Sequence, residues 1–124
     1  MMRRLSIGLF AFLVAALPAL AAAPTTSLLT NITATGAGSA FSWRNYAASS
    51  FQATVTTGGV ASVNIEASLD SANWVVLTTL ALGSSNPLVV GYSVTAPAWP
   101  YVRGNVTALS GTGTPTVNLT MYPQ

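Results

Sequence analysis

The segment ASVNIEASLD, residues 61–70, alternates hydrophobic and polar residues without interruption. Successive side chains of a β-strand point to opposite faces of its sheet, so this alternation predicts a strand with one buried and one solvent-facing side. We expect Val63, Ile65 and Leu69 to be buried together on the hydrophobic side. Glu66 and Asp70 then fall on the polar side of the same strand.

Three other segments repeat the alternation: SFQATVTT (50–57), YVRGNVTAL (101–109) and TPTVNLTMY (114–122). Their expected inward positions are Phe51, Ala53 and Val55; Val102, Val106 and Ala108; and Val117, Leu119 and Met121. The chain is also rich in Thr and Val, whose branched side chains favour strands. We expect no helix after the N-terminal segment.

Turn-forming residues separate these segments. They lie at TGAGS (35–39), TGG (57–59), DSAN (70–73), GSSNP (83–87), APAWP (96–100) and SGTGTP (110–115). Short strands at a spacing of about 8–12 residues are typical of a sandwich. We therefore predict an all-β fold, an antiparallel β-sandwich that is Ig-like or jelly-roll-like, with about 7–8 strands.

The first residues, MMRRLSIGLFAFLVAALPALAAAP, have the pattern of a secretory signal. Arg3 and Arg4 precede a hydrophobic helix over residues 5–17, Pro18 breaks it, and ALA at 19–21 fits a cleavage site after Ala21. The alternative is an uncleaved anchor, because residues 5–23 are close to the length of about 20 residues that spans a bilayer. The signal predicts a secreted, periplasmic or cell-surface protein.

These patterns divide the chain into three parts. Residues 1–21 are the signal peptide, residues 22–39 an N-terminal arm and first strand, and residues 40–124 the β-sandwich domain, which forms one domain with the arm. Within the arm, we expect Pro24 to Asn31 to be flexible or to exchange with another chain.

Charge is scarce in this chain. Its 124 residues hold four basic and two acidic side chains, for a formal net charge of +2. Loss of Arg3 and Arg4 with the signal leaves Arg44 and Arg103 against Glu66 and Asp70, so the remaining side chains sum to zero. A protein that follows nucleic acid neutralises several phosphates with basic side chains, so we expect no nucleic-acid partner. Contact with a membrane is expected only through an uncleaved N-terminal segment.

The absent residue types limit the chemistry. The chain has no Cys, no His and no Lys. It therefore lacks disulfides, the imidazole and thiolate ligands of zinc sites, and a His or Lys base for a serine nucleophile. We expect no cofactor, no metal and no enzymatic activity.

The two carboxylates do not form a catalytic pair on this pattern. Four residues along a strand separate Cα atoms by about 13–14 Å, whereas the carboxyl groups of glycosidases lie about 5–9.5 Å apart. Asp70 fits better at the first position of a type I turn, with Asn73 closing the turn and Trp74 packing inside after it. The alternative is a calcium site made by Asp70, Asn73 and loop carbonyls, for which one carboxylate supplies little charge.

The aromatic residues supply the candidate binding site. Trp99 stands between Pro97 and Pro100, in a segment that resists strand pairing, so we expect it to be the most exposed tryptophan. Trp99, Tyr101 and Arg103 could together stack on a sugar ring. The alternative is that these aromatic residues pack in the core or at its rim.

From Phe41 to Met121 the chain resembles small β-sandwich proteins of tailed phages and prophages. The matching segments are SFQATVTTGG (50–59), VNIEASLDSANWVVLTTL (63–80) and YVRGNVTALSGTGTPTVNLTM (101–121). The resemblance implies a structural or accessory role, at the virion surface if the chain is phage-encoded, and it supplies no catalytic residues. The secretion signal departs from that family, because virion proteins assemble in the cytoplasm, and leaves open a bacterial surface protein of the same fold.

Two functions fit these observations. The first is a structural or decorating surface protein that assembles with itself or coats a virion or a cell. The second is a secreted, adhesin-like module that binds glycans through exposed aromatic side chains.

Overall fold

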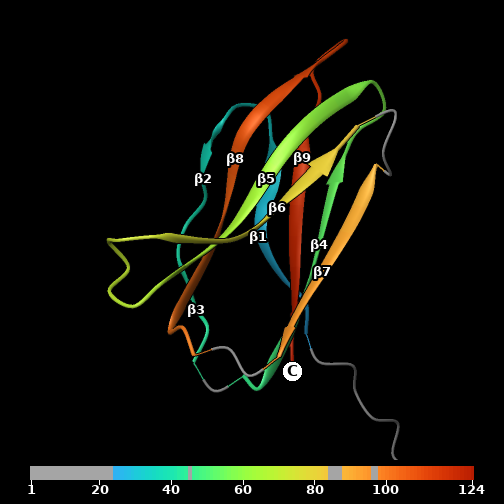
Figure 1. Cartoon of the computed structure of the whole chain (residues 1–124). Coiled ribbons are helices and arrows are strands. Elements are labelled where there is room, and N and C mark those ends of the chain that lie inside the picture. Colours follow the sequence, from blue (N-terminus) through green and yellow to red (C-terminus); the bar gives the residue numbers. More distant parts are fainter. Residues whose placement is uncertain (1–23, 45, 84–87, 96–97) are drawn as a thin grey trace, which may run out of the picture.

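The computed structural model describes residues 24–44, 46–83, 88–95 and 98–124. In these residues the chain forms nine strands and no helix, and the strands make two antiparallel sheets that face each other (Figure 1). The all-β prediction is therefore confirmed. The proposed signal helix lies outside the described residues, and within them no helix is long and hydrophobic enough to span a bilayer.

Each sheet has a simple order. Sheet A runs β1 (Thr26–Ile32), β9 (Val117–Pro123), β4 (Ala48–Val55) and β7 (Val89–Thr95). Sheet B runs β2 (Gly36–Ala37), β8 (Tyr101–Gly111), β5 (Gly59–Ser68) and β6 (Val75–Leu82), and β3 (Phe41–Ser42) also pairs with β8. The strand number exceeds the prediction because β2 and β3 are fragments of two residues each, too short to give a sequence pattern.

The core lies between the sheets and follows the predicted alternation. All the inward residues expected on β4 and β9 are buried, as are Ala61, Val63, Ile65 and Ala67 of β5. Trp43 completes the core: its Nε1 donates to Ser49 Oγ over 2.7 Å, and its ring meets Phe51 edge-on with centroids 5.6 Å apart. The inward position of Gly104 is needed for close packing, because a Cβ there would lie 2.6 Å from Leu119.

Two inward predictions are wrong, and both fail where a strand departs from regularity. Leu69 is 68 % exposed because β5 ends at Ser68, one residue earlier. Ala108 is exposed because the register of β5 and β8 shifts between Ser62 and Val63. The extra residue in β8 turns Leu109 toward the core in place of Ala108.

The first strand begins within the segment that we expected to be flexible or to exchange with another chain. Residues 26–32 form β1, which pairs antiparallel with β9 of the same chain, so this segment is part of sheet A. Leu28 and Leu29 are adjacent and both buried. Two register shifts in the pairing with β9 accompany this departure from alternation, and they hid the strand from a search for period two.

The buried position of Ile65, with no exposed surface, predicts a large effect of truncation. We expect Ile65→Ala to lower the free energy of unfolding by about 2–5 kcal/mol, because it leaves a cavity between the sheets. Leu69→Ala is the matched control and should change it by less than about 0.5 kcal/mol. Urea unfolding measures both, and similar losses at the two positions would contradict this description of β5.

Candidate functional site

The outer face of sheet B carries a network of charged and amide side chains from β5 and β8. Pairing of β5 with β8 places Glu66 opposite Arg103, Asn64 opposite Asn105 and Ser68 opposite Tyr101. Directly opposite residues of an antiparallel pair have neighbouring side chains. The register alone therefore gathers a carboxylate, a guanidinium and two amides in one place.

Glu66 is the centre of this network. Its Oε2 accepts a hydrogen bond from Arg103 Nε over 2.7 Å, and its Oε1 accepts one from Asn105 Nδ2 over 2.8 Å. The side chains of Glu66 and Arg103 are only 7 % and 24 % exposed. Asn64 in turn accepts a hydrogen bond from Thr79 Oγ1 over 2.8 Å, which ties β6 to the network.

Burial raises the pKa of the Glu66 carboxyl, but the hydrogen bonds from Asn105 and Arg103, the charge of Arg103 and the Asn64 side chain outweigh it. The pKa of Glu66 therefore lies below its ordinary value of 4.5. An ionised carboxylate with both oxygens engaged is not suited to act as a general acid or base at neutral pH. Its role here is structural.

Trp74 belongs to this face rather than to the core. The guanidinium carbon of Arg103 lies 4.1 Å from the centroid of the Trp74 ring, a cation–π contact. Trp74 is half-buried, so the expectation that it packs inside is wrong. The reason is the cross-strand partner: Arg103 covers the indole from β8, which the local sequence around Trp74 does not reveal.

The predicted binding residues are only partly brought together. Tyr101 and Arg103 lie two residues apart on the same face of β8, and Arg44 lies with its guanidinium carbon 5.6 Å from the Tyr101 ring centroid. Trp99 is half-buried and packs against the core, so the expectation of an exposed Trp99 is wrong. Trp74 takes the place on this face that the sequence interpretation gave to Trp99.

Asp70 organises the turn between β5 and β6. Its Oδ1 accepts from the backbone N–H of Ala72 (2.9 Å) and of Asn73 (2.8 Å), and its Oδ2 accepts from Asn73 Nδ2 (2.7 Å). Ser68 Oγ donates to Oδ1 over 2.9 Å. These donors, led by the Asn73 backbone, hold the pKa of Asp70 well below its ordinary value of 3.8.

The turn itself is not the type I turn that we expected. Ser71 has a φ of +62°, whereas that position in a type I turn has a negative φ. Both oxygens of Asp70 are engaged by donors of their own turn, and the described residues hold no cluster of three or more acidic, His or Cys side chains.

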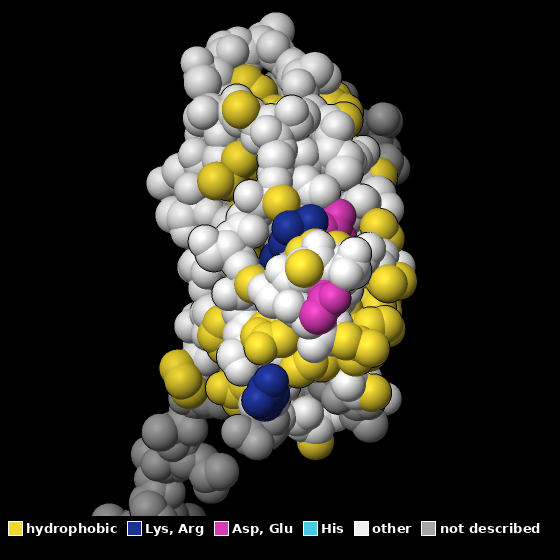
Figure 2. Space-filling view, turned by 90° about the vertical axis from the view of Figure 1, so that its left-hand side faces the viewer, with side chains coloured by type: hydrophobic (Ala, Val, Ile, Leu, Met, Phe, Trp, Pro, Cys, Tyr) yellow, Lys and Arg dark blue, Asp and Glu magenta, His cyan; other side chains and the backbone are white. Residues whose placement is uncertain are grey.

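Exposed hydrophobic side chains accompany this turn. Leu69, Val75 and Val76 are 68 %, 50 % and 49 % exposed, and all three flank the hairpin that joins β5 to β6. Seen from the side of Figure 1 where β2 and β8 lie, hydrophobic side chains gather next to the few charged ones (Figure 2). Apolar side chains therefore border the network on the side of the β5–β6 hairpin.

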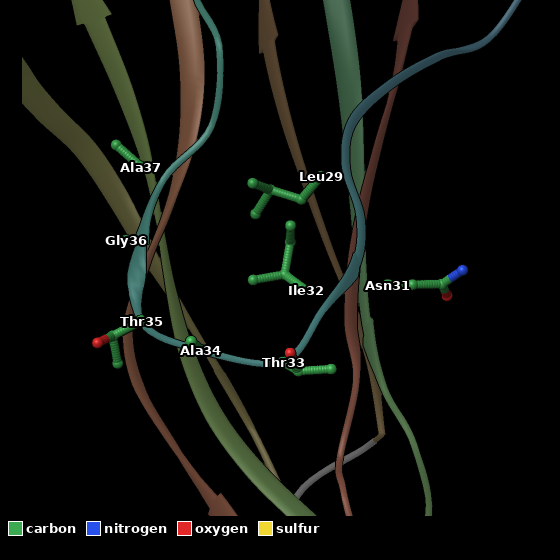
Figure 3. Close-up of a pocket in the computed structure, with 8 residues that line it drawn as sticks. All are labelled: Leu29, Asn31, Ile32, Thr33, Ala34, Thr35, Gly36 and Ala37. Atoms are coloured by element: carbon green, nitrogen blue, oxygen red, sulfur yellow. The ribbon is translucent and has the colours of Figure 1, made fainter.

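A separate hollow lies where β1 crosses to β2. It has a volume of about 340 Å³ and is lined by Leu29 and residues 31–37 (Figure 3). Leu29 and Ile32 point into it, while Asn31 points away (Figure 3). With apolar side chains inside and no titratable group in its lining, the hollow offers no catalytic chemistry, and sequence reasoning did not find it.

Acidification tests the two carboxylates together. Both have folded-state pKa values below their ordinary ones, so the stability they add is complete above about pH 5 and is lost as the pH falls below about 4.5. We expect urea unfolding of the wild type to show this loss. Glu66→Gln with Asp70→Asn should remove most of the loss, and a double variant with the wild-type pH dependence would contradict the assignment.

Two substitutions of Asp70 distinguish the contribution of its Oδ1 from that of its Oδ2. Asp70→Asn keeps the acceptor for the Ala72 and Asn73 backbone N–H groups but loses the charge and the Oδ2 acceptor of Asn73 Nδ2, so it should lower the melting temperature partway. Asp70→Ala leaves those donors without a partner in the protein and should lower it clearly more. Millimolar calcium should not raise the melting temperature of the wild type or of either variant. A calcium-dependent increase that Asp70→Asn abolishes would instead identify a metal site.

Comparison with known proteins adds no family to this description. No protein-family model matches the chain, and no curated protein matches it. The resemblance to sandwich proteins of phages and prophages therefore stays a prediction.

Proposed function

We propose that this chain is a non-enzymatic structural protein that assembles with itself or coats a virion or a cell surface. The observation that carries the proposal is that both acidic side chains are engaged by hydrogen bonds within the chain. Glu66 is held by Arg103 and Asn105, and Asp70 by its own turn. Apart from Arg44 and the turn of Asp70, what remains for contact with partners is a surface of hydroxyl, amide and apolar groups.

The strand order supports the same proposal. When β2 and β3 are counted as one interrupted strand, the sheets read 1-8-3-6 and 2-7-4-5, which is the order of a jelly roll. Jelly rolls build many capsid and lectin domains. The shared strand order favours a coat role by analogy of fold.

The N-terminal pattern sets the proposed location. A signal with Arg3 and Arg4 before its hydrophobic segment would export the chain, so that it acts as a secreted, periplasmic or cell-surface protein. If the chain is encoded by a phage, the coated particle is the virion. The chain has no Cys and therefore no disulfide. Its stability outside the cell would depend on its hydrophobic core and strand pairing.

Glycan binding is the second candidate, and a specific juxtaposition favours it. Trp74, Tyr101 and Arg103 lie on one face with the amides of Asn64 and Asn105. Aromatic rings beside amide and charged groups are suited to a polyhydroxylated ligand, which needs both an apolar surface and directional hydrogen bonds.

The location of the protein in cells tests the coating role. The full chain with a C-terminal epitope tag should be exported by a bacterial host, sediment with envelopes or particles and be labelled on intact cells. A product that stays in the cytoplasm, or that is exported but binds no envelope or particle, would contradict the coating role.

Retention on insoluble polysaccharides tests the glycan candidate. It predicts that Tyr101→Ala and Trp74→Ala lose retention at least about tenfold, as expected when a stacking aromatic is removed. Tyr122→Ala, on sheet A, is the matched control and should be retained. A wild-type chain that no polysaccharide retains would exclude this candidate.

A further inference from the structure

The edges of the two sheets are protected to different degrees. Natural sheets discourage pairing with other chains through short edge strands, bulges, charges or prolines. β2 and β3 are two residues long, the pairing of β1 with β9 contains two register shifts, and that of β6 with β5 contains one. β7, the remaining edge, has none of these protections.

β7 is a regular strand at the margin of sheet A (Figure 1). It pairs with β4 at seven successive positions, from Thr95 opposite Ala48 to Val89 opposite Thr54, without a register shift. Residues 89–95, VVGYSVT, contain no charged residue and no proline. In the part of the chain that the structure describes, no strand pairs with the other side of β7.

The backbone geometry identifies which groups of β7 face outward. Val55 N–H donates to the Leu88 carbonyl over 3.0 Å, in line with the β4–β7 ladder. Hydrogen-bonded positions alternate in an antiparallel pair, so the backbone groups of Val90, Tyr92 and Val94 point toward β4. Those of four residues therefore point away from it: Val89, Gly91, Ser93 and Thr95.

The side chains of β7 also stop short of full burial. Val90, Tyr92 and Val94 pack against the core and remain half-exposed. Phe51 lies next to Tyr92 with ring centroids 6.3 Å apart, so the aromatic layer of the core extends to this edge. A further strand would cover the rest of this apolar layer.

We infer that β7 pairs antiparallel with β7 of a second copy and joins the two sheets A into one continuous sheet. A two-fold axis through Tyr92 places Val90 opposite Val94, Gly91 opposite Ser93 and Val89 opposite Thr95 of the partner copy. Every pair then joins residues of the same face, as an antiparallel register requires. All four residues with outward backbone groups gain a partner.

The charge distribution favours a second copy as the occupant. Arg44, Glu66, Asp70 and Arg103 are the charged side chains of residues 24–124, and none lies on a strand of sheet A. Two identical chains often repel each other through like charges, but here no such charge stands at the interface. The isologous pairing is also closed, which gives a discrete dimer as the unit of assembly.

Oligomeric state tests this inference, which rests on the proposed assembly function. By light scattering after size exclusion, the exported protein should have twice the mass of one chain. Ser93→Lys and Ser93→Glu should each weaken association at least about 100-fold, because like charges then lie diagonally across the two-fold axis. An equimolar mixture of the two variants should restore the dimer.

Two further variants complete the test. Thr30→Lys adds the same charge to the other edge of sheet A and should leave the dimer intact. Gly91→Pro removes one outward N–H that would donate to the second copy, so it should also weaken association. The variant should still fold, because proline is tolerated in an edge strand. Circular dichroism checks that each variant is folded.

Three results would overturn the inference: a monomeric wild type at all concentrations, a Ser93→Lys variant that stays dimeric, or equal dissociation by Thr30→Lys. A monomer that still labels the cell or particle surface would refute the β7 interface and leave the coating function standing. A dimer that reaches no cell or particle surface would support the β7 interface and refute the coating function.

Discussion

The Glu66 carboxylate lies on the central strand pair of sheet B with 7 % of its side chain exposed, and an unpaired charge at that position would destabilise the sheet. Arg103 and Asn105, both on β8, supply the neutralising groups. The same pairing of β5 with β8 places Val63 beside Val106 on the inner face. One ladder thus forms part of the core on one side and the polar network on the other, in a chain without disulfides.

Besides the pair of Glu66 and Arg103, Asp70 and Arg44 are the charged side chains of residues 24–124. Glu66 is engaged by Arg103, Asp70 is engaged by its turn, and Arg103 also lies over Trp74. Such a surface has little long-range field to steer a charged ligand. Under the proposed assembly function, contacts with partners depend on backbone groups at sheet edges and on apolar or hydroxyl-bearing side chains.

The four segments singled out for their alternation all form strands, but alternation alone did not find every strand. Burial of Val63 and Ile65 follows from the two-residue alternation. The alternation does not predict β1, because the adjacent residues Leu28 and Leu29 are both buried. Ala108 was misplaced because a one-residue irregularity exchanges the two faces of a strand. Local sequence carries no sign of such a shift, since it depends on the partner strand.

The candidate site shows the same limit. Tyr101 and Arg103 share a face because they are two residues apart, which the sequence gives directly. Trp74 joins them only through the register of β5, β6 and β8, and Trp99 leaves them because it packs against the core. Edge exposure of β7 is likewise a property of strand order, which alternation along one segment does not specify.

A double-mutant cycle of Glu66→Gln and Arg103→Gln tests the central claim most directly, because it isolates the interaction between the two side chains from their other contacts. The free energy of unfolding of the wild type, both single variants and the double variant is measured by urea titration at pH 7. If the pair stabilises the β5–β8 ladder, the losses of unfolding free energy in the two single variants sum to more than the loss in the double variant. The difference, the coupling energy, should be about 1–3 kcal/mol. Losses that add within about 0.5 kcal/mol would contradict it.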